Sequence, residues 1–286
     1  MVDNNETTNN KDNITNYDFL DLSYDSLSGL SYGKKLGGNR GITFETNPEK
    51  YQQLIEKSKT DKELAKHKII NQNPLNIKIN KLNQEKFDFT VCLDTTSGLN
   101  GIDETKVLLE KTLRLSKKFV YISQINFDSD VILFKKGFKT NFSDWSRKNC
   151  HLTSNIFFNI LFDFYKRGFI EDYIIYYTVP IKNSKDPIIH PLNSPKNQPA
   201  FNEESHPSKN ENIKFKNIYR NINILITKNG FKKIDDILES TKKDNHILYD
   251  SRTGIYDDST EKFKDKSNAK KNSIFGKVNK YLNSDV

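Results

Sequence analysis

The sequence predicts an α/β fold with a mostly parallel sheet and helices on both faces. Two observations support this class. Strand-like and helix-like segments alternate along the middle of the chain, which favours parallel strands joined by right-handed crossovers. Segment 87–93, FDFTVCL, is apolar and β-branched through its middle, as a central strand buried on both faces should be. The expected strands cover residues 19–22, 41–44, 75–79, 87–93, 119–123, 170–179 and 218–227.

The first unit of this alternation, residues 19–47, carries the most chemical information. Its first strand contains Asp21 and leads into a loop of small and polar residues, where a helix begins. Free amides at the start of such a helix face a ligand beyond the carboxyl end of the strand. The second strand ends at Glu45, where a carboxylate can accept hydrogen bonds from both hydroxyls of a ribose. The unit therefore predicts a site for a nucleoside-containing ligand.

This opening resembles that of the class I S-adenosylmethionine-dependent methyltransferases. Asp21 matches the acid of that family's first motif, and Glu45 matches the acid that holds the ribose of the cofactor. The resemblance covers about residues 17–230. It implies a Rossmann-like, seven-stranded, mostly parallel sheet whose last strand is antiparallel, and S-adenosylmethionine as the cofactor. It also implies that Ser23, Asp25 and Gly29 belong to the cofactor-binding loop.

The chain departs from the family at two points. Where the family carries a G-x-G run directly after the acid, this chain has Ser23, Tyr24 and Asp25, and its first glycine is Gly29. Where many members place an acid beside the adenine, after the third expected strand, this chain has Asn80 and Lys81. Two functions therefore stay open: a methyltransferase acting on O or N of a small-molecule or glycan-type acceptor, and a catalytically inactive binding protein on the same fold.

Helices are expected at 48–59, 104–115 and 153–168, each with apolar residues at helical spacing or a clear cap. Asp94 directly follows the central strand 87–93. In the resembled family this strand borders the cofactor, which implies that Asp94 lies at the rim of the site. The alternative is that Asp94 only caps the next helix.

A long loop between the fifth strand and the next helix holds the candidate catalytic residues Asp144 and His151. Methyl transfer to an alcohol or an amine needs a base, and histidine has a suitable pKa. Trp145, the one tryptophan, is expected to stack on a flat acceptor or a sugar face. The structural alternatives are an Asp144 that caps a turn, a Trp145 that fills the core and a His151 that binds a backbone group.

The connector at 180–215 contains six of the eight prolines, so it is ordered only where it packs across another part of the chain. We expect a lid or an acceptor-binding loop, with His190 and Asn193 as hydrogen-bonding residues. No H-x-H or H-x-x-E-H spacing is present, and no metal site is expected.

The flanking segments are polar. We expect a disordered Asn-rich tail at 1–16, a methyltransferase-like domain at 17–235 and a charged tail at 236–286. Two distant cysteines favour a reducing cytoplasm, and no apolar run approaches the roughly 20 residues of a membrane span. No membrane partner is expected. The net charge of +8 comes from lysines interspersed with acids, so nucleic-acid binding is a weaker alternative.

Overall fold

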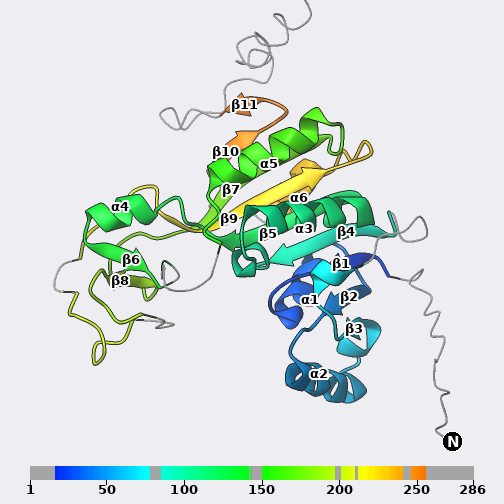
Figure 1. Ribbon diagram of the computed structural model, residues 1–286, viewed down its shortest axis with the longest axis horizontal. Coiled ribbons are helices and arrows are strands. Elements are labelled where there is room, and N and C mark those ends of the chain that lie inside the picture. Colours follow the sequence, from blue (N-terminus) through cyan, green and yellow to red (C-terminus); the bar gives the residue numbers. More distant parts are fainter. Residues whose placement is uncertain are drawn as a thin grey trace, which may run out of the picture.

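The computed structural model describes residues 17–77, 85–141, 143, 150–196, 201–209, 212–240 and 246–255 (Figure 1). The strands are β1 (Phe19–Asp21), β2 (Gly41–Phe44), β3 (Lys68–Ile70), β4 (Phe87–Leu93), β5 (Ser116–Ile125), β6 (Phe138–Thr140), β7 (Asp172–Pro180), β8 (Ile189–Pro191), β9 (Tyr219–Thr227), β10 (His246–Asp250) and β11 (Gly254–Ile255). The α-helices are α1 (Ser26–Lys35), α2 (Pro48–Thr60), α3 (Ile102–Leu115), α4 (Asp130–Lys135), α5 (Ser154–Lys166) and α6 (Ile234–Ser240).

Nine of the described strands form one sheet in the order β11-β10-β7-β9-β5-β4-β1-β2-β3. Strands β3, β2, β1, β4 and β5 are parallel, whereas β9 runs antiparallel between β5 and β7. The predicted α/β class, with a mostly parallel sheet and an antiparallel last strand of the core, is therefore confirmed. The strand count is nine rather than seven, because β10 and β11 extend the sheet beyond β7.

Helices cover both faces of the sheet, and each face has its own apolar core. On one face, Leu108 of α3 and Leu161 of α5 pack with sheet residues such as Ile224. On the other face, Leu30 of α1 and Ile237 of α6 pack with a different set. There the rings of Phe19, Phe89 and Phe119 stack across β1, β4 and β5, with centroids 5.3 and 4.6 Å apart. Successive side chains of a strand point to opposite faces of the sheet, so each central strand contributes residues to both cores.

The third strand lies earlier in the chain than the sequence predicted. The alternation of Leu75, Ile77 and Ile79 predicted a strand at 75–79, but β3 spans Lys68–Ile70, and Leu75 lies in the 3-10 helix η3 (Pro74–Asn76). Leu75 and Ile77 pack against the α3 side of the core, so their apolar character reflects loop packing rather than strand pairing. The rest of that segment, 78–84, lies outside the described residues, together with Asn80 and Lys81.

Part of the segment expected to be a C-terminal tail contributes to the sheet. Strand β10 pairs antiparallel with β7, and Tyr249 is 8% exposed among the residues of the core. Helix α6 also lies mostly within 236–286 and packs on the opposite face. The described fold therefore extends to residue 255. The separation of the two flanking tails from the domain stays a prediction, since 1–16 and 256–286 lie outside the described residues.

The loop after β5 and the proline-rich connector combine into a small module. Strand β6 of the loop pairs antiparallel with β8 of the connector, and α4 packs against them through Leu133, Phe138 and Ile189. In Figure 1 this module, hereafter the β6–β8 module, stands apart from the large sheet, past the end of β5. Two segments that are separate in the sequence thus form one structure beyond the carboxyl end of β5.

Candidate functional site

A cavity of about 490 Å³ lies at the carboxyl ends of β1, β2 and β4. Its lining comes from the loops that follow these strands, from the loop after β3 and from the start of α3. Ligands of open α/β sheets bind outside the carboxyl ends of the strands, and a cavity of this size accommodates a small-molecule ligand. The fold therefore places a candidate site where the sequence predicted one.

Glu45 is the acid that this cavity receives from β2. The residue is 8% exposed, and its Oε1 accepts a hydrogen bond from the backbone N–H of Asn47 at 2.9 Å. Its second oxygen, Oε2, has no hydrogen-bond partner among the described residues, so it is available to a ligand. The bond to Asn47 fixes the carboxylate, because Asn47 also caps α2 with its own side chain. A carboxylate that is held in place by one oxygen and has the other oxygen free is suited to accept hydrogen bonds from vicinal hydroxyls.

The loop after β1 approaches the cavity with Leu22, Ser23 and Tyr24. Tyr24 donates its N–H to the carbonyl of Leu93, and Ser23 Oγ accepts the N–H of Leu93 at 3.0 Å, so the loop is fastened to the end of β4. The side chain of Tyr24 is 74% exposed and does not fill the cavity. Leu27 does not line it. The loop therefore leaves the cavity open although it lacks the family's glycines.

Asp21 lies beneath this loop instead of in the cavity. Its carboxylate is fully buried, with Oδ1 accepting from the N–H of Ser23 at 2.9 Å and Oδ2 from Thr43 Oγ1 at 2.7 Å. Burial raises its pKa to about 7, more than these hydrogen bonds lower it. Gly29 packs directly on this carboxylate: a Cβ there would lie 1.9 Å from Oδ1. Asp21 and Gly29 thus position the loop and do not line the cavity.

The two remaining cofactor-site predictions also fall outside the cavity lining. Asp25 caps α1 by accepting the N–H of Ser28 at 3.1 Å, and it is exposed. Asp94 adopts a left-handed backbone conformation with φ of 55°, and desolvation raises the pKa of its carboxyl group. Its neighbour Thr95 lines the cavity. Of the six predicted residues, Ser23 and Glu45 therefore reach the cavity in this structure.

Sequence reasoning missed several lining residues, among them Tyr24, Asn73, Thr95 and Glu104. Asn73 belongs to the loop after β3, and it was missed because the third strand was placed too late in the chain. Its side chain caps η3 by accepting the N–H of Leu75 at 2.9 Å. The signal that would have identified Tyr24, Asn73 and Thr95 is their position shortly after a strand, since the carboxyl ends of parallel strands lie at the same end of the sheet. Glu104 lies in the first turn of α3 and carries no such signal.

The predicted catalytic residues lie in the segment between the β6–β8 module and α5. Asp144 and Trp145 lie outside the described residues. His151 stacks on Phe127 with ring centroids 4.2 Å apart and an interplanar angle of 7°. Cys150 donates its N–H to the carbonyl of Ser97, next to Gly98, which lines the cavity. His151 is therefore held beside the loop that follows β4, although it does not line the cavity.

The predicted acceptor-binding residues lie in the β6–β8 module. His190 is 1% exposed in β8 and packs edge-on against His206, with ring centroids 4.5 Å apart. Burial, followed by the charges of nearby groups, lowers its pKa to about 4. Asn193 is exposed just after β8. Within the described part of the chain, no three His, Cys, Asp or Glu side chains gather in a geometry suited to a metal ion.

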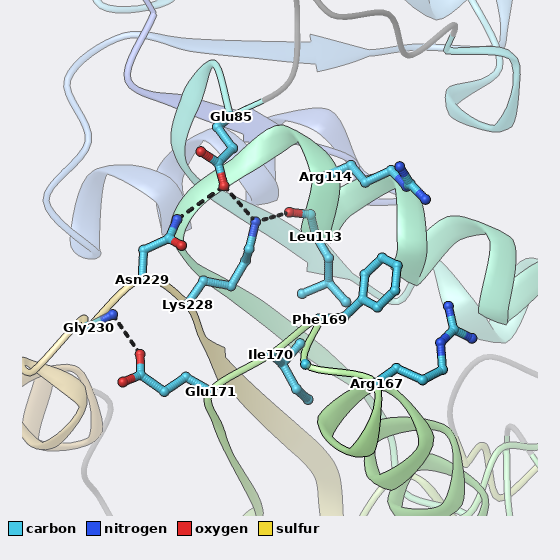
Figure 2. A pocket seen from close by; sticks show the side chains of 11 residues that line it. Glu85, Leu113, Arg114, Arg167, Phe169, Ile170, Glu171, Lys228, Asn229 and Gly230 are labelled. Carbon is cyan, nitrogen blue, oxygen red and sulfur yellow. Dashed lines mark hydrogen bonds and ion pairs between the residues drawn. The ribbon is translucent and has the colours of Figure 1, made fainter.

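A larger hollow of about 730 Å³ lies at the amino ends of β4, β5 and β7, at the other end of the strands from the first cavity (Figure 2). Lys228 lines it and donates to Glu85 at 3.2 Å and to the carbonyls of Leu113 and Ser116, near the end of α3. Glu171 accepts the N–H of Gly230 at 2.6 Å. Cations at the C-terminal ends of helices compensate the helix dipole. Arg114 and Arg167, which also line the hollow, pair with Glu110 and Asp163, so each described charged side chain of the lining has a partner within the chain.

Solved structures similar to this chain include three methyltransferases. The chain is 15% identical to the CcbJ methyltransferase of Streptomyces caelestis over 38% of its own length and 43% of that chain, with a TM-score of 0.33. A possible histamine N-methyltransferase of Thermotoga maritima is 12% identical, over 74% of this chain and 83% of that one, with a TM-score of 0.44. The magnesium protoporphyrin IX methyltransferase of Synechocystis PCC 6803, with bound SAH, is 11% identical, over 76% of this chain and 76% of that one, with a TM-score of 0.43.

No family model matches the sequence, and no curated protein matches it. The similarity to solved structures concerns the fold, and the acceptor has to be inferred from this chain's own residues. Of the helices in the described ranges, none combines the length and the apolar character that a membrane crossing demands.

Proposed function

We propose that this protein binds S-adenosylmethionine and transfers its methyl group to O or N of a small-molecule or glycan-type acceptor. The observation that carries the proposal is the cavity in which Glu45 and the loop after β1 face the same space. The strand order of the core is the second support, since β9 lies antiparallel between β5 and β7 as the sequence resemblance implies. A cytoplasmic site of action is part of the same proposal.

The residues of the cavity fit the proposed cofactor. Glu45 offers the free Oε2 to the ribose hydroxyls, and the loop from Leu22 to Tyr24 borders the part nearest β4. Asn73, in the loop after β3, stands where the resemblance implies an acid beside the adenine. Its Oδ1 already accepts the N–H of Leu75, so its Nδ2 is the group that can donate to the adenine edge. Bound there, S-adenosylmethionine would supply an activated methyl group.

The chain's own contribution to the reaction would be positioning and proton removal. His151 and Asp144 are the proposed bases. The β6–β8 module with Asn193 is the proposed acceptor-binding part, together with Trp145, which lies outside the described residues. His190 is 1% exposed, so it would support this module from within and not contact the acceptor. His151 is held near the cavity through the bond from Cys150 to Ser97 and through its stacking on Phe127. General-base catalysis contributes on the order of a hundredfold or more in rate. The variant His151→Gln should therefore lose transfer while cofactor affinity is unchanged.

Isothermal titration with S-adenosylmethionine and S-adenosylhomocysteine tests the binding step. The variant Glu45→Gln keeps the acceptor for the N–H of Asn47 and removes the charge, so it should weaken binding by about tenfold, the effect of roughly 1.4 kcal/mol. Glu56→Gln is the matched control, because Glu56 is an exposed acid of α2 paired with Lys59. An absence of binding heat at millimolar cofactor would contradict the proposal, as would equal affinity in the Glu45 and Glu56 variants.

A catalytically inactive binding protein is the second candidate, and the loop after β1 favours it. The N–H of Ser23 is used by Asp21 and that of Tyr24 by Leu93, so neither amide is free for a ligand. Transfer of a radiolabelled methyl group from S-adenosylmethionine into the small-molecule and glycan fractions of a cell extract distinguishes the two candidates. An inactive protein whose cofactor site is lost would label neither fraction. Nucleic-acid binding remains a weaker alternative, and labelling of RNA or DNA in the same extract would support it.

A further inference from the structure

Helix α4 of the β6–β8 module exposes most of its apolar side chains. Leu133 is fully buried in the module, where it packs with Phe138 and Ile189. The other apolar residues of the helix, Val131, Ile132 and Phe134, are 64%, 43% and 66% exposed. Of the apolar residues of this short helix, Leu133 alone is buried in the module, and the other three are exposed. Singly exposed apolar residues are common, but such a cluster marks an interaction surface.

A groove of about 380 Å³ continues this apolar surface between α4 and the strands of the module. Its apolar lining is Val131, Phe134, Phe138 and Leu192. Ile132 does not line the groove, so the exposed apolar surface is wider than a ligand seated in the groove would cover. The surface formed by these residues is called the α4 surface below.

Lysines surround the α4 surface. Lys139 and Lys196 line the groove itself, and Lys135 and Lys136 are exposed at the end of α4. Among the described residues, the acid that lines the groove is Asp130, whose Oδ1 accepts a hydrogen bond from Ser143 at 2.6 Å. Around the groove the described lysines therefore outnumber the acids. The α4 surface combines a protruding apolar turn with a cationic rim.

We propose that the α4 surface docks on an anionic lipid bilayer, with Val131, Ile132 and Phe134 entering the interface and the lysines contacting the headgroups. Apolar side chains beside basic ones bind lipid surfaces in this way, and no membrane-spanning segment is needed. The proposal therefore departs from the expectation of no membrane partner, which rested on the absence of a spanning segment. A second copy of the chain fits the surface less well. In a two-fold symmetric pair the same lysines would face one another, and one helical turn is small for a stable interface. This inference does not rest on the proposed methyl transfer.

Co-sedimentation of the full chain with vesicles tests the proposal. Vesicles of phosphatidylglycerol and phosphatidylcholine in equal parts should retain the protein, and pure phosphatidylcholine vesicles should retain far less. Retention should fall several-fold at high salt, where the screening length drops to about 3 Å. The double variant Val131→Ser/Phe134→Ser should bind the anionic vesicles about tenfold more weakly or worse. Lys135→Gln/Lys136→Gln should weaken binding to the anionic vesicles alone.

Val107→Ser is the matched control, because Val107 is a 48% exposed valine of α3, outside the module. Circular dichroism of each variant reports whether it is folded. The proposal is overturned if the wild-type chain does not bind anionic vesicles, or if the serine variants of α4 bind as well as the Val107 variant. It is equally overturned if the chain does not bind vesicles but forms a dimer in solution that is lost when Phe134 is replaced. The surface would then be a self-association site.

Discussion

Asp21 shows how a residue that matches a functional motif can act through the backbone. Its carboxylate is buried among Ser23, Thr43 and Gly29, and it fixes the turn by which the chain leaves β1. Because burial raises its pKa to about 7, from 3.8, the folded protein holds a proton that the unfolded chain releases. Folding stability from this group is therefore greatest below about pH 4 and is lost as the pH rises to about 7.

The variant Asp21→Asn should flatten this pH dependence. Asparagine is neutral, and its amide can accept from Ser23 while it donates to Thr43 Oγ1. Between pH 4 and 8 the free energy of unfolding of the wild type should fall relative to that of the variant, by up to about 4 kcal/mol. Urea unfolding of both proteins at several pH values measures the difference. Parallel stability curves for the two proteins would show that Asp21 does not titrate in this range.

Gly29 provides a steric test of the same packing. In Gly29→Ala the new Cβ would overlap the Asp21 carboxylate, which hydrogen bonds on both sides hold in place. Overpacking of this kind should cost about 1–3 kcal/mol of stability. Gly98→Ala is the control, because a Cβ at Gly98 meets nothing within 4 Å. Thermal unfolding should separate the two variants, and equal melting temperatures would contradict the packing described.

At the scale of elements, the β6–β8 module depends on buried histidines. His190 contacts His206 and Phe201, and the charges that face it belong to His206, Lys209 and Lys139. Lys209 lies 3.9 Å from the centroid of the Phe201 ring, so an added charge on His190 would meet further positive charge. The neutral imidazole is therefore part of the module's core.

Acidification should loosen this module before it affects the large sheet. The pKa of His190 is lowered to about 4 from 6.5, so its contribution to stability is complete above pH 6.5 and is lost as the pH falls toward 4. Hydrogen exchange, corrected for its intrinsic pH dependence, should show several-fold faster opening of β6 and β8 at pH 5 than at pH 7.5. In His190→Phe this difference should shrink. An unchanged difference would assign the opening to another group.

At the scale of the molecule, the extension β10–β11 joins the sheet edge to α6. Arg252, in the turn between these strands, donates to Asp250 at 2.7 Å and to Asp235 of α6 at 3.1 Å. Asp250 is 1% exposed, so its carboxylate depends on this arginine. The contact connects the hairpin β10–β11 at the edge of the sheet to a helix on the face opposite α3 and α5.

Removal of the arginine should therefore destabilise the whole fold. Arg252→Ala leaves the buried carboxylate of Asp250 without its cation, at an expected cost of about 3 kcal/mol. Lys59→Ala breaks an exposed pair with Glu56 and should cost less than about 1 kcal/mol. Chemical denaturation of both variants gives the comparison. Equal losses would mean that solvent replaces the partner of Asp250.

Most of the large sheet was predictable because its signals are local. The strands at 41–44 and 87–93 coincide with β2 and β4, and α5 follows the expected helix closely. The short edge strand β3 was misplaced, since three residues with one lysine carry a weaker pattern than the apolar loop after them. Strand β10 was missed because its five residues, HILYD, lie within a polar, charged segment that was predicted to be a tail.

The sequence by itself determined the α/β alternation and the place of Glu45, because periodicity and the residue that ends a strand are local properties of the chain. Only the tertiary structure decided that Asp21 and Gly29 support the loop, that Asn73 and Thr95 join Glu45 around one cavity, and that residues near 139 and 190 form one module. These relations depend on which distant segments of the chain the sheet and its connections bring together. A local sequence pattern does not encode contacts between residues that are far apart in the sequence.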